Sequence, residues 1–245
     1  MDVPLTVAAA LEDRPVSGAV CLEAGAGYGN ATAGLLAAGA ARVYAVTNDP
    51  DHADAVRERV GGDDRTAVLR AGLREVPLAT DAVDLVTAHG LFNVLPPAAA
   101  ESVAAEVTRV AAPGAHLVVD DYEPLPADAA VADLFAVENA ATELAAGRPA
   151  LTFYPASLLR RLLAGLGWEF DRERTLLDPV PWTESHLRAH ADATRTAAAT
   201  LSAESDESGA ADLGASLSAE ADRLAAAIGE ESVGTMYSLA FRRPE

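Results

Sequence analysis

The sequence contains no lysine, so arginine supplies all 18 basic residues of a 245-residue chain that has 37 acidic ones. The formal net charge of -19 opposes sequence-independent binding to nucleic acid or to anionic membranes, and we expect neither as a partner. The same composition is typical of proteins that work at very high salt, where a Debye length of about 3 Å leaves little long-range steering. The missing lysines therefore indicate a halophilic, salt-rich cytoplasm more directly than they indicate a substrate.

Cysteine, aromatic residues and long apolar runs are scarce as well. The single cysteine, Cys21, excludes an intramolecular disulfide and a cysteine-rich metal site, and its apolar neighbours predict an unreactive buried thiol. Aromatic residues make up 5% of a chain that is 50% hydrophobic, so we expect a core built from small side chains. No apolar run is long enough to span a membrane, and no basic region precedes an apolar stretch at the N-terminus. We therefore predict a cytoplasmic location.

The sequence does contain an alternation of strand-like apolar runs with helix-like segments. This alternation predicts an α/β fold in which helices flank a mostly parallel sheet. The expected strands are residues 19–24, 42–47, 67–71, 83–88, 116–121, 168–175 and 233–241. The expected core helices are residues 31–38, 52–60, 98–111 and 156–166, with a Pro113-Gly114 turn before the fifth strand.

Two stretches are longer than ordinary connections. Residues 1–179 form the predicted core, which carries a helical insertion at about 126–150. Residues 180–231 form a second helical insertion, in which the periodicity predicts one helix at 213–228 and the composition of residues 202–209 predicts a flexible break. Residues 232–245 return to the sheet as a terminal strand.

A glycine-rich turn, Gly25-Ala-Gly27-Tyr-Gly29, closes the first strand and opens the first helix. Glycines at such a place allow a tight turn and let a ligand lie against the backbone at the N-terminus of a helix. A dinucleotide-binding fingerprint would have a third glycine at the position of Asn30. The spacing therefore argues against a nicotinamide dinucleotide.

The turn, together with Glu23 two residues before it, resembles motif I of the class I S-adenosylmethionine-dependent methyltransferases. Three later passages resemble the same family in the same order. They are Pro77-Leu78 with Asp84-Leu-Val86, the stretch Glu106-Val-Thr-Arg-Val-Ala-Ala-Pro-Gly-Ala-His-Leu-Val-Val, and residues 157–168 with their closing Gly167-Trp168. The resemblance covers roughly residues 18–175. It implies a Rossmann-like class I methyltransferase fold with a seven-stranded sheet, and S-adenosyl-L-methionine as the cofactor.

The resemblance also implies which residues hold the cofactor. Glu23 would bind the methionyl amino group, and the turn would lie along the ribose and methionine; the implied turn residues are Gly25, Gly27, Gly29 and Asn30. Thr47 stands where the family has an acidic residue that binds the ribose, so Asn48 or Asp49 would take over, although Asp49 is equally suited to cap the next helix. Gly72 stands where the family has an aspartate facing the adenine, which leaves that contact to backbone groups of Gly72 and Leu73.

Two strand ends carry polar side chains suited to catalysis. His89 follows the fourth strand beside the expected methyl position and is both the candidate base and a candidate cofactor contact. A hydrogen bond to its own loop or a helix cap is the structural alternative. Asp120 and Asp121 end the fifth strand and point to opposite sides, so we expect at most one of them to face the site. Asp120 is the second catalytic candidate, and no metal is expected. His186 and His190 lie four residues apart, a spacing that indicates a solvated helix face rather than a metal site.

These observations predict an S-adenosylmethionine-dependent methyltransferase that acts on a small-molecule acceptor by in-line methyl transfer. The resemblance implies that the two insertions cover the acceptor as a lid, and the alternative is that they form the surface of a homodimer. A non-catalytic S-adenosylmethionine-binding scaffold is a second interpretation, which the departures at Thr47 and Gly72 make credible. An RNA methyltransferase is a third, but no basic or aromatic cluster supports it.

Overall fold

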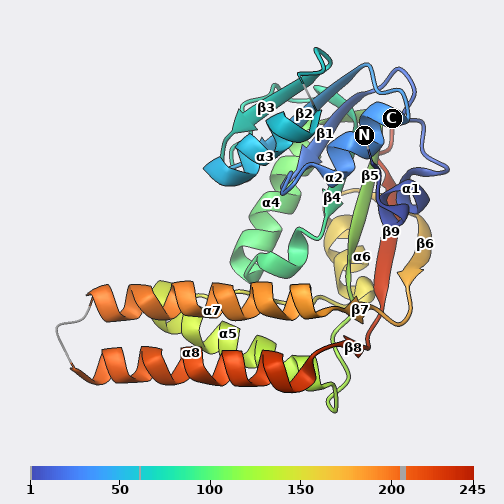
Figure 1. The fold of residues 1–245 in the computed structure, drawn as a ribbon. Helices are drawn as coiled ribbons and strands as arrows, with labels where there is room; N and C mark the ends of the chain where they lie inside the picture. The colour runs from blue at the N-terminus through green and yellow to red at the C-terminus, as the bar shows by residue number, and fades with distance from the viewer. Residues whose placement is uncertain (1, 61, 205–207) are drawn as a thin grey trace.

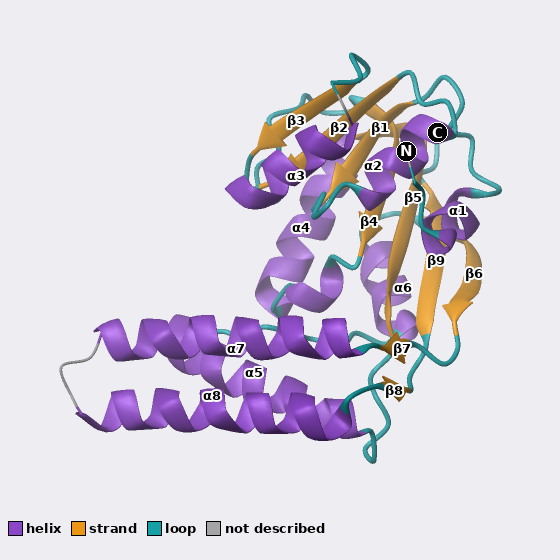
Figure 2. Cartoon of the chain, viewed as in Figure 1, coloured by secondary structure: helices purple, strands orange, loops and turns teal. Residues whose placement is uncertain are grey.

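A computed structural model of the chain describes residues 2–60, 62–204 and 208–245. Seven strands form one sheet in the order β3-β2-β1-β4-β5-β9-β6, with helices on both faces (Figure 1; Figure 2). The strands of this sheet are β1 (Val20–Ala24), β2 (Arg42–Thr47), β3 (Thr66–Arg70), β4 (Val83–His89), β5 (Ala111–Tyr122), β6 (Glu169–Leu177) and β9 (Met236–Arg242). The helices are α1 (Leu5–Leu11), α2 (Asn30–Ala37), α3 (Pro50–Val60), the 3-10 turn η1 (Phe92–Val94), α4 (Pro97–Val110), α5 (Ala130–Ala146), α6 (Ala156–Gly165), α7 (Glu184–Glu204) and α8 (Ser208–Ile228).

The direction of the strands confirms the predicted seven-stranded, mostly parallel sheet. Strands β1 to β5 run parallel to one another, and β9 lies antiparallel to both of its neighbours, β5 and β6. The order of the strands reverses between β1 and β4. Ligands of open α/β sheets bind outside the carboxyl ends of the strands at such a reversal. The fold therefore predicts a ligand site at the carboxyl ends of β1 and β4.

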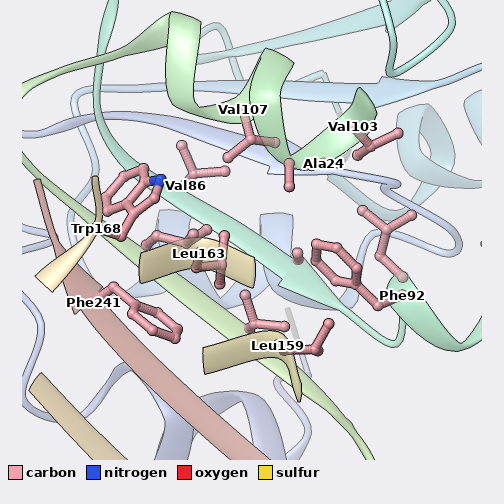
Figure 3. Packing of buried hydrophobic residues seen from close by; sticks show 14 of the residues in the cluster. Ala24, Val86, Phe92, Val103, Val107, Leu159, Leu163, Trp168 and Phe241 are labelled. Carbon is pink, nitrogen blue, oxygen red and sulfur yellow. The ribbon is translucent and has the colours of Figure 1, made fainter. Parts of the chain in front are cut away.

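Each face of the sheet is buried under its own set of helices. On one face, α1, α2 and α3 cover a cluster that includes Val7, Leu35 and Val56. On the other face, α4 and α6 cover a cluster in which Leu163 and Phe241 are completely buried (Figure 3). Burying one such side chain contributes about 1.5–3 kcal/mol relative to leaving it in water. The two clusters together make the sheet a rigid platform for whatever lies at its carboxyl edge.

Helices α5, α7 and α8 pack against one another as a separate group, joined to the sheet by the short β7 (Pro181–Trp182) and β8 (Glu231–Ser232) ribbon. Figure 1 shows this group beyond the carboxyl ends of β4 and β5, with α7 and α8 lying side by side. Its core has Leu134, Phe135 and Trp182 buried together. Both oxygens of Glu231 accept N–H groups at the start of α5, at 3.0 Å from Ala130 and 2.7 Å from Val131. Glu231, which is about 100 residues away in sequence, therefore stabilises the first turn of α5.

The structure differs from the sequence prediction in the helices. The sequence did not predict α1, which is short and packs Val7 so closely on α2 that a Cβ at Gly34 would lie 2.5 Å from Val7 Cγ1. The second insertion contains two long helices where one was predicted, because α7 buries a face of Leu187 and small residues that gives little hydrophobic contrast. Residues 205–207, in the segment predicted as a flexible break, lie outside the described residues.

Two smaller expectations concern single positions. The prediction of a turn at Pro113-Gly114 before the fifth strand was wrong, because both residues lie inside β5, next to a register shift in its pairing with β4. Such irregularities are where a sheet tolerates proline. Cys21 is buried as predicted, and its burial, together with the charge of Asp84, raises the pKa of the thiol to about 12. None of the helices in the described residues combines the length and apolar character needed to cross a membrane.

Candidate functional site

The glycine turn is built on the end of β1 and is anchored by Glu23. The Glu23 side chain is 2% exposed and accepts N–H groups of α2, from Ala31 at 3.1 Å and from Thr32 at 2.9 Å, as well as the Thr32 hydroxyl. Burial raises the pKa of Glu23 to about 7, although these hydrogen bonds and the charge of His89 act to lower it. The residue to which the resemblance assigns the methionyl amino group therefore also holds the start of α2 against the sheet.

The three glycines of the turn share a backbone conformation but not their surroundings. Gly25, Gly27 and Gly29 all have positive φ, at 75°, 47° and 75°, which L side chains rarely adopt. A Cβ at Gly25 would lie 2.8 Å from Leu91 Cδ1, whereas a Cβ at Gly27 would meet nothing within 4 Å. Asn30 is the first residue of α2, directly after Gly29. The backbone at Gly27 is therefore the part of the turn that a ligand can approach.

The end of β2 settles one alternative that the sequence left open. Asp49 caps α3, because its Oδ1 accepts the N–H groups of Asp51 at 2.8 Å and His52 at 3.1 Å. Thr47 is buried and its hydroxyl accepts the N–H of Asp49 at 3.2 Å, while Asn48 is exposed. The capping role of Asp49 is thus confirmed, and the ribose-binding roles of these residues stay predictions.

On the far side of the turn, Gly72 is exposed and open, and Leu73 is half-buried. Leu73 Cδ1 lies 3.7 Å from the position of a Cβ at Gly25, so the segment predicted to contact the adenine does border the turn. The sequence did not single out Tyr28, which is 67% exposed and meets His52 edge to face with ring centroids 5.1 Å apart. Its position between Gly27 and Gly29 was the sequence signal that could have identified Tyr28 as a residue beside the predicted ligand site.

Parallel pairing of β4 with β5 brings His89 and Asp120 together. The two residues are register partners at the carboxyl ends of the strands, and His89 Nδ1 lies 3.0 Å from Asp120 Oδ2. Burial alone would lower the pKa of His89, but the hydrogen bond and charge of Asp120, with the charges of Glu23 and Asp121, outweigh it and raise that pKa. Both catalytic candidates of the sequence therefore form one hydrogen-bonded pair, which the sequence did not predict.

Asp121 has different partners from Asp120, as expected for adjacent residues of a strand. Its carboxylate accepts the N–H groups of Asn93 and Tyr122, each at 2.9 Å. Burial raises the pKa of Asp121 to about 7, while these backbone donors and the charge of His89 act to lower it. Asp121 therefore fixes η1 to the end of β5.

The prediction of a solvated helix face at His186 and His190 was wrong for His190. His190 Nδ1 lies 2.7 Å from Glu138 Oε2, a nearly buried carboxylate on α5, and its ring lies 4.5 Å from that of Phe135. His186 is exposed. The mispredicted residue lies where α5 and α7 pack together, a contact between segments about fifty residues apart. Within the described residues, no group of three or more His, Cys, Asp or Glu side chains is arranged to hold a metal ion.

A parallel sheet of this strand order, with a glycine turn after β1 and an acidic residue beneath it, defines the class I methyltransferase fold. Comparison with known proteins agrees: the profile of the methyltransferase domain family matches residues 22–119. That part of the chain is therefore similar in sequence to methyltransferase domains.

Individual proteins show the extent of the similarity. Demethylmenaquinone methyltransferase from Clavibacter sepedonicus is 34% identical over 113 residues, a match that covers 46% of this chain and 44% of that protein. A candidate methyltransferase structure from Bacillus halodurans C-125 covers 98% of this chain and 99% of its own, with a TM-score of 0.66 at 14% identity. The structure of a 1,6-didemethyltoxoflavin-N1-methyltransferase from Burkholderia thailandensis, with bound 1,6-didemethyltoxoflavin and S-adenosylhomocysteine, matches with a TM-score of 0.59 at 15% identity. The match covers 100% of this chain and 80% of that one. At these identities the two structures establish the shared fold alone.

Proposed function

We propose that this protein is an S-adenosylmethionine-dependent methyltransferase that acts on a small molecule. The observation that carries the proposal is the His89–Asp120 pair, which lies at the carboxyl edge of the sheet one strand away from the glycine turn. The turn provides an open backbone at Gly27 and a helix N-terminus, the features that a bound nucleoside and its methionine chain require. When bound, the cofactor supplies an electrophilic methyl group.

The residues of the chain then account for positioning and proton transfer. With Nδ1–H donating to Asp120, the imidazole of His89 presents Nε2 as a proton acceptor. Asp120 holds the ring in one orientation, as a base in a catalytic pair requires. Because the acidic neighbours raise the pKa of His89, the neutral form that accepts a proton becomes populated only at higher pH than for an ordinary histidine.

We also propose that the helical insertions cover the bound acceptor. Helices α5, α7 and α8 lie beyond the ends of β4 and β5, where they would exclude water from a small acceptor (Figure 2). The domain limits are proposed as residues 1–179 for the core, 180–231 for the lid and 232–245 for the returning strand. A homodimer through the same helices, a cytoplasmic location and adaptation to high salt stay predictions.

Transfer of a labelled methyl group tests the proposal. A small-metabolite extract is incubated with the protein and methyl-labelled S-adenosylmethionine in multimolar salt, and labelled products are separated by mass. We expect at least one labelled product with the native chain and with the matched control His186→Ala, and loss of at least about 100-fold of its rate with His89→Ala. Equal rates for the native chain and His89→Ala would show that the base is wrongly assigned, and label only in protein or RNA would exclude a small acceptor.

A further inference from the structure

The charges that act most strongly on His89 are all negative. They come from Asp120 on β5, from Glu23 on β1 and from Asp121, the neighbour of Asp120. The chain has no lysine, so a compensating cation in this region would have to be an arginine. The site is therefore built to receive positive charge.

The two arginines nearest in the sheet pattern, Arg174 and Arg172 on β6, are already engaged. Arg174 is the register partner of Ser238, but its guanidinium pairs with Glu12 and donates to the carbonyl of Ala9. Ser238 on β9 is the register partner of Asp120, and its hydroxyl accepts a hydrogen bond from Arg172 at 3.3 Å. The guanidinium of Arg172 also donates to the carbonyl of Ala10 and pairs with Asp13. It is directed toward α1 and its flanking loop, so it does not neutralise the end of β5.

Asp120 retains an unused acceptor. The residue is 3% exposed, and while Oδ2 binds His89, no described residue donates a hydrogen bond to Oδ1. A buried acceptor that lacks a donor destabilises the site, so a donor from outside the chain is favoured there. A protonated amine would supply both the missing hydrogen bond and the missing positive charge.

We propose that the methyl acceptor is an amine, bound as an ammonium group between Asp120 and His89. This inference rests on the proposed function and names the substrate class of the same site. Tyr122 lies two residues beyond Asp120, on the same face of β5, and is half-buried. Its ring borders that of Phe153 at a centroid distance of 6.3 Å, and such rings attract an alkylammonium group.

The same two side chains account for the chemistry. The ammonium group donates a proton to Nε2 of neutral His89, which becomes an imidazolium stabilised by Asp120. The freed nitrogen lone pair forms the new C–N bond with the methyl carbon as the C–S bond breaks, and that bonding pair stays on sulfur. The products are a protonated N-methylamine and a neutral thioether, and His89 later releases its proton to water. A carboxylate or phenolate acceptor would instead face three acidic side chains.

Matched probes test this inference on the full chain in multimolar salt. S-adenosylhomocysteine binding is measured first by calorimetry on the native chain, on Asp120→Asn and on the control Asp128→Asn, an exposed residue in the loop before α5. Each complex is then titrated with benzylamine, benzoate and benzyl alcohol at pH 7. Methyl transfer is followed with labelled cofactor at pH 8.5, because the raised pKa of His89 leaves more of its neutral form there. Asp120→Asn keeps the size and one acceptor oxygen of the side chain but removes its charge.

We expect benzylamine to bind the native complex at least about ten-fold more tightly than benzoate or benzyl alcohol, and to yield labelled N-methylbenzylamine. Asp120→Asn should lose that preference while binding S-adenosylhomocysteine within about two-fold of the native chain, and Asp128→Asn should keep both. Failure of the native chain to bind S-adenosylhomocysteine would refute the proposed function. Normal binding of it, combined with no preference for the amine or with an equal preference in Asp120→Asn, would refute the amine assignment alone.

Discussion

Three substitutions, Gly25→Ala, Gly27→Ala and Gly147→Ala, distinguish two costs of adding a side chain. One is the strain of a positive φ, which all three positions share, and the other is steric overlap of the new Cβ, which differs between them. A positive φ costs an L residue about 1–2 kcal/mol, and no other cost is expected at Gly27 or Gly147, where a Cβ would meet nothing within 4 Å. At Gly25 the Cβ would lie 2.8 Å from Leu91 Cδ1, inside the buried cluster under α4, which adds about 1–3 kcal/mol of overpacking. Gly147, which ends α5 far from the turn, is the control for the backbone.

We therefore expect Gly25→Ala to lower the free energy of unfolding by about 2–5 kcal/mol, and the other two variants by about 1–2 kcal/mol. Urea unfolding in multimolar salt measures these values, and each kcal/mol corresponds to about 2–4 °C in Tm for a chain of this size. Calorimetry with S-adenosylhomocysteine on the same samples should show at least about ten-fold weaker binding for Gly27→Ala and unchanged binding for Gly147→Ala.

Two results would refute the reasoning. Equal destabilisation of Gly25→Ala and Gly147→Ala would mean that Leu91 does not constrain the turn. Native affinity in Gly27→Ala would mean that the ligand does not lie against this backbone, whatever the stability of the variant.

Three further predictions concern protonation, a helix cap and the core. Burial raises the pKa values of Glu23 and Asp121 to about 7, so the folded state binds more protons than the unfolded state above about pH 4.5. The free energy of unfolding should therefore fall between pH 5 and 7, by on the order of 3 kcal/mol for each group. A rise over that interval in urea titrations would contradict this. Asp49→Ala removes the cap of α3 and should cost about 0.5–2 kcal/mol, and no change would show that the cap is dispensable. Leu163→Ala should cost about 2–5 kcal/mol, against less than about 1 kcal/mol for the 40% exposed Leu158→Ala on the same helix; similar losses for both would contradict the packing.

Much of the sheet could be predicted from the sequence because strands such as β1, β2 and β4 are short runs rich in apolar residues. The β2 strand begins and ends where the run of residues 42–47 predicts. Alanine-rich helices were harder: α7 has little contrast between its faces, so its buried side becomes visible only once α5 packs against it.

The candidate site likewise has a part that could be predicted from the sequence and a part that could not. The glycine turn and Glu23 are local in sequence, so their motif could be recognised directly. The pairing of His89 with Asp120 depends on the register between β4 and β5, and the contact of His190 with Glu138 depends on the packing of two insertions. Such contacts between distant segments are set by tertiary structure, and no local pattern encodes them.

The central claim is that the turn after β1 binds S-adenosylmethionine. Its most direct test is a calorimetric titration of the native chain in multimolar salt with S-adenosylhomocysteine, alongside a competition titration with NAD. The structure predicts binding of one S-adenosylhomocysteine per chain that NAD does not displace. Tight binding of NAD, or the absence of any S-adenosylhomocysteine binding by a folded chain, would contradict the claim.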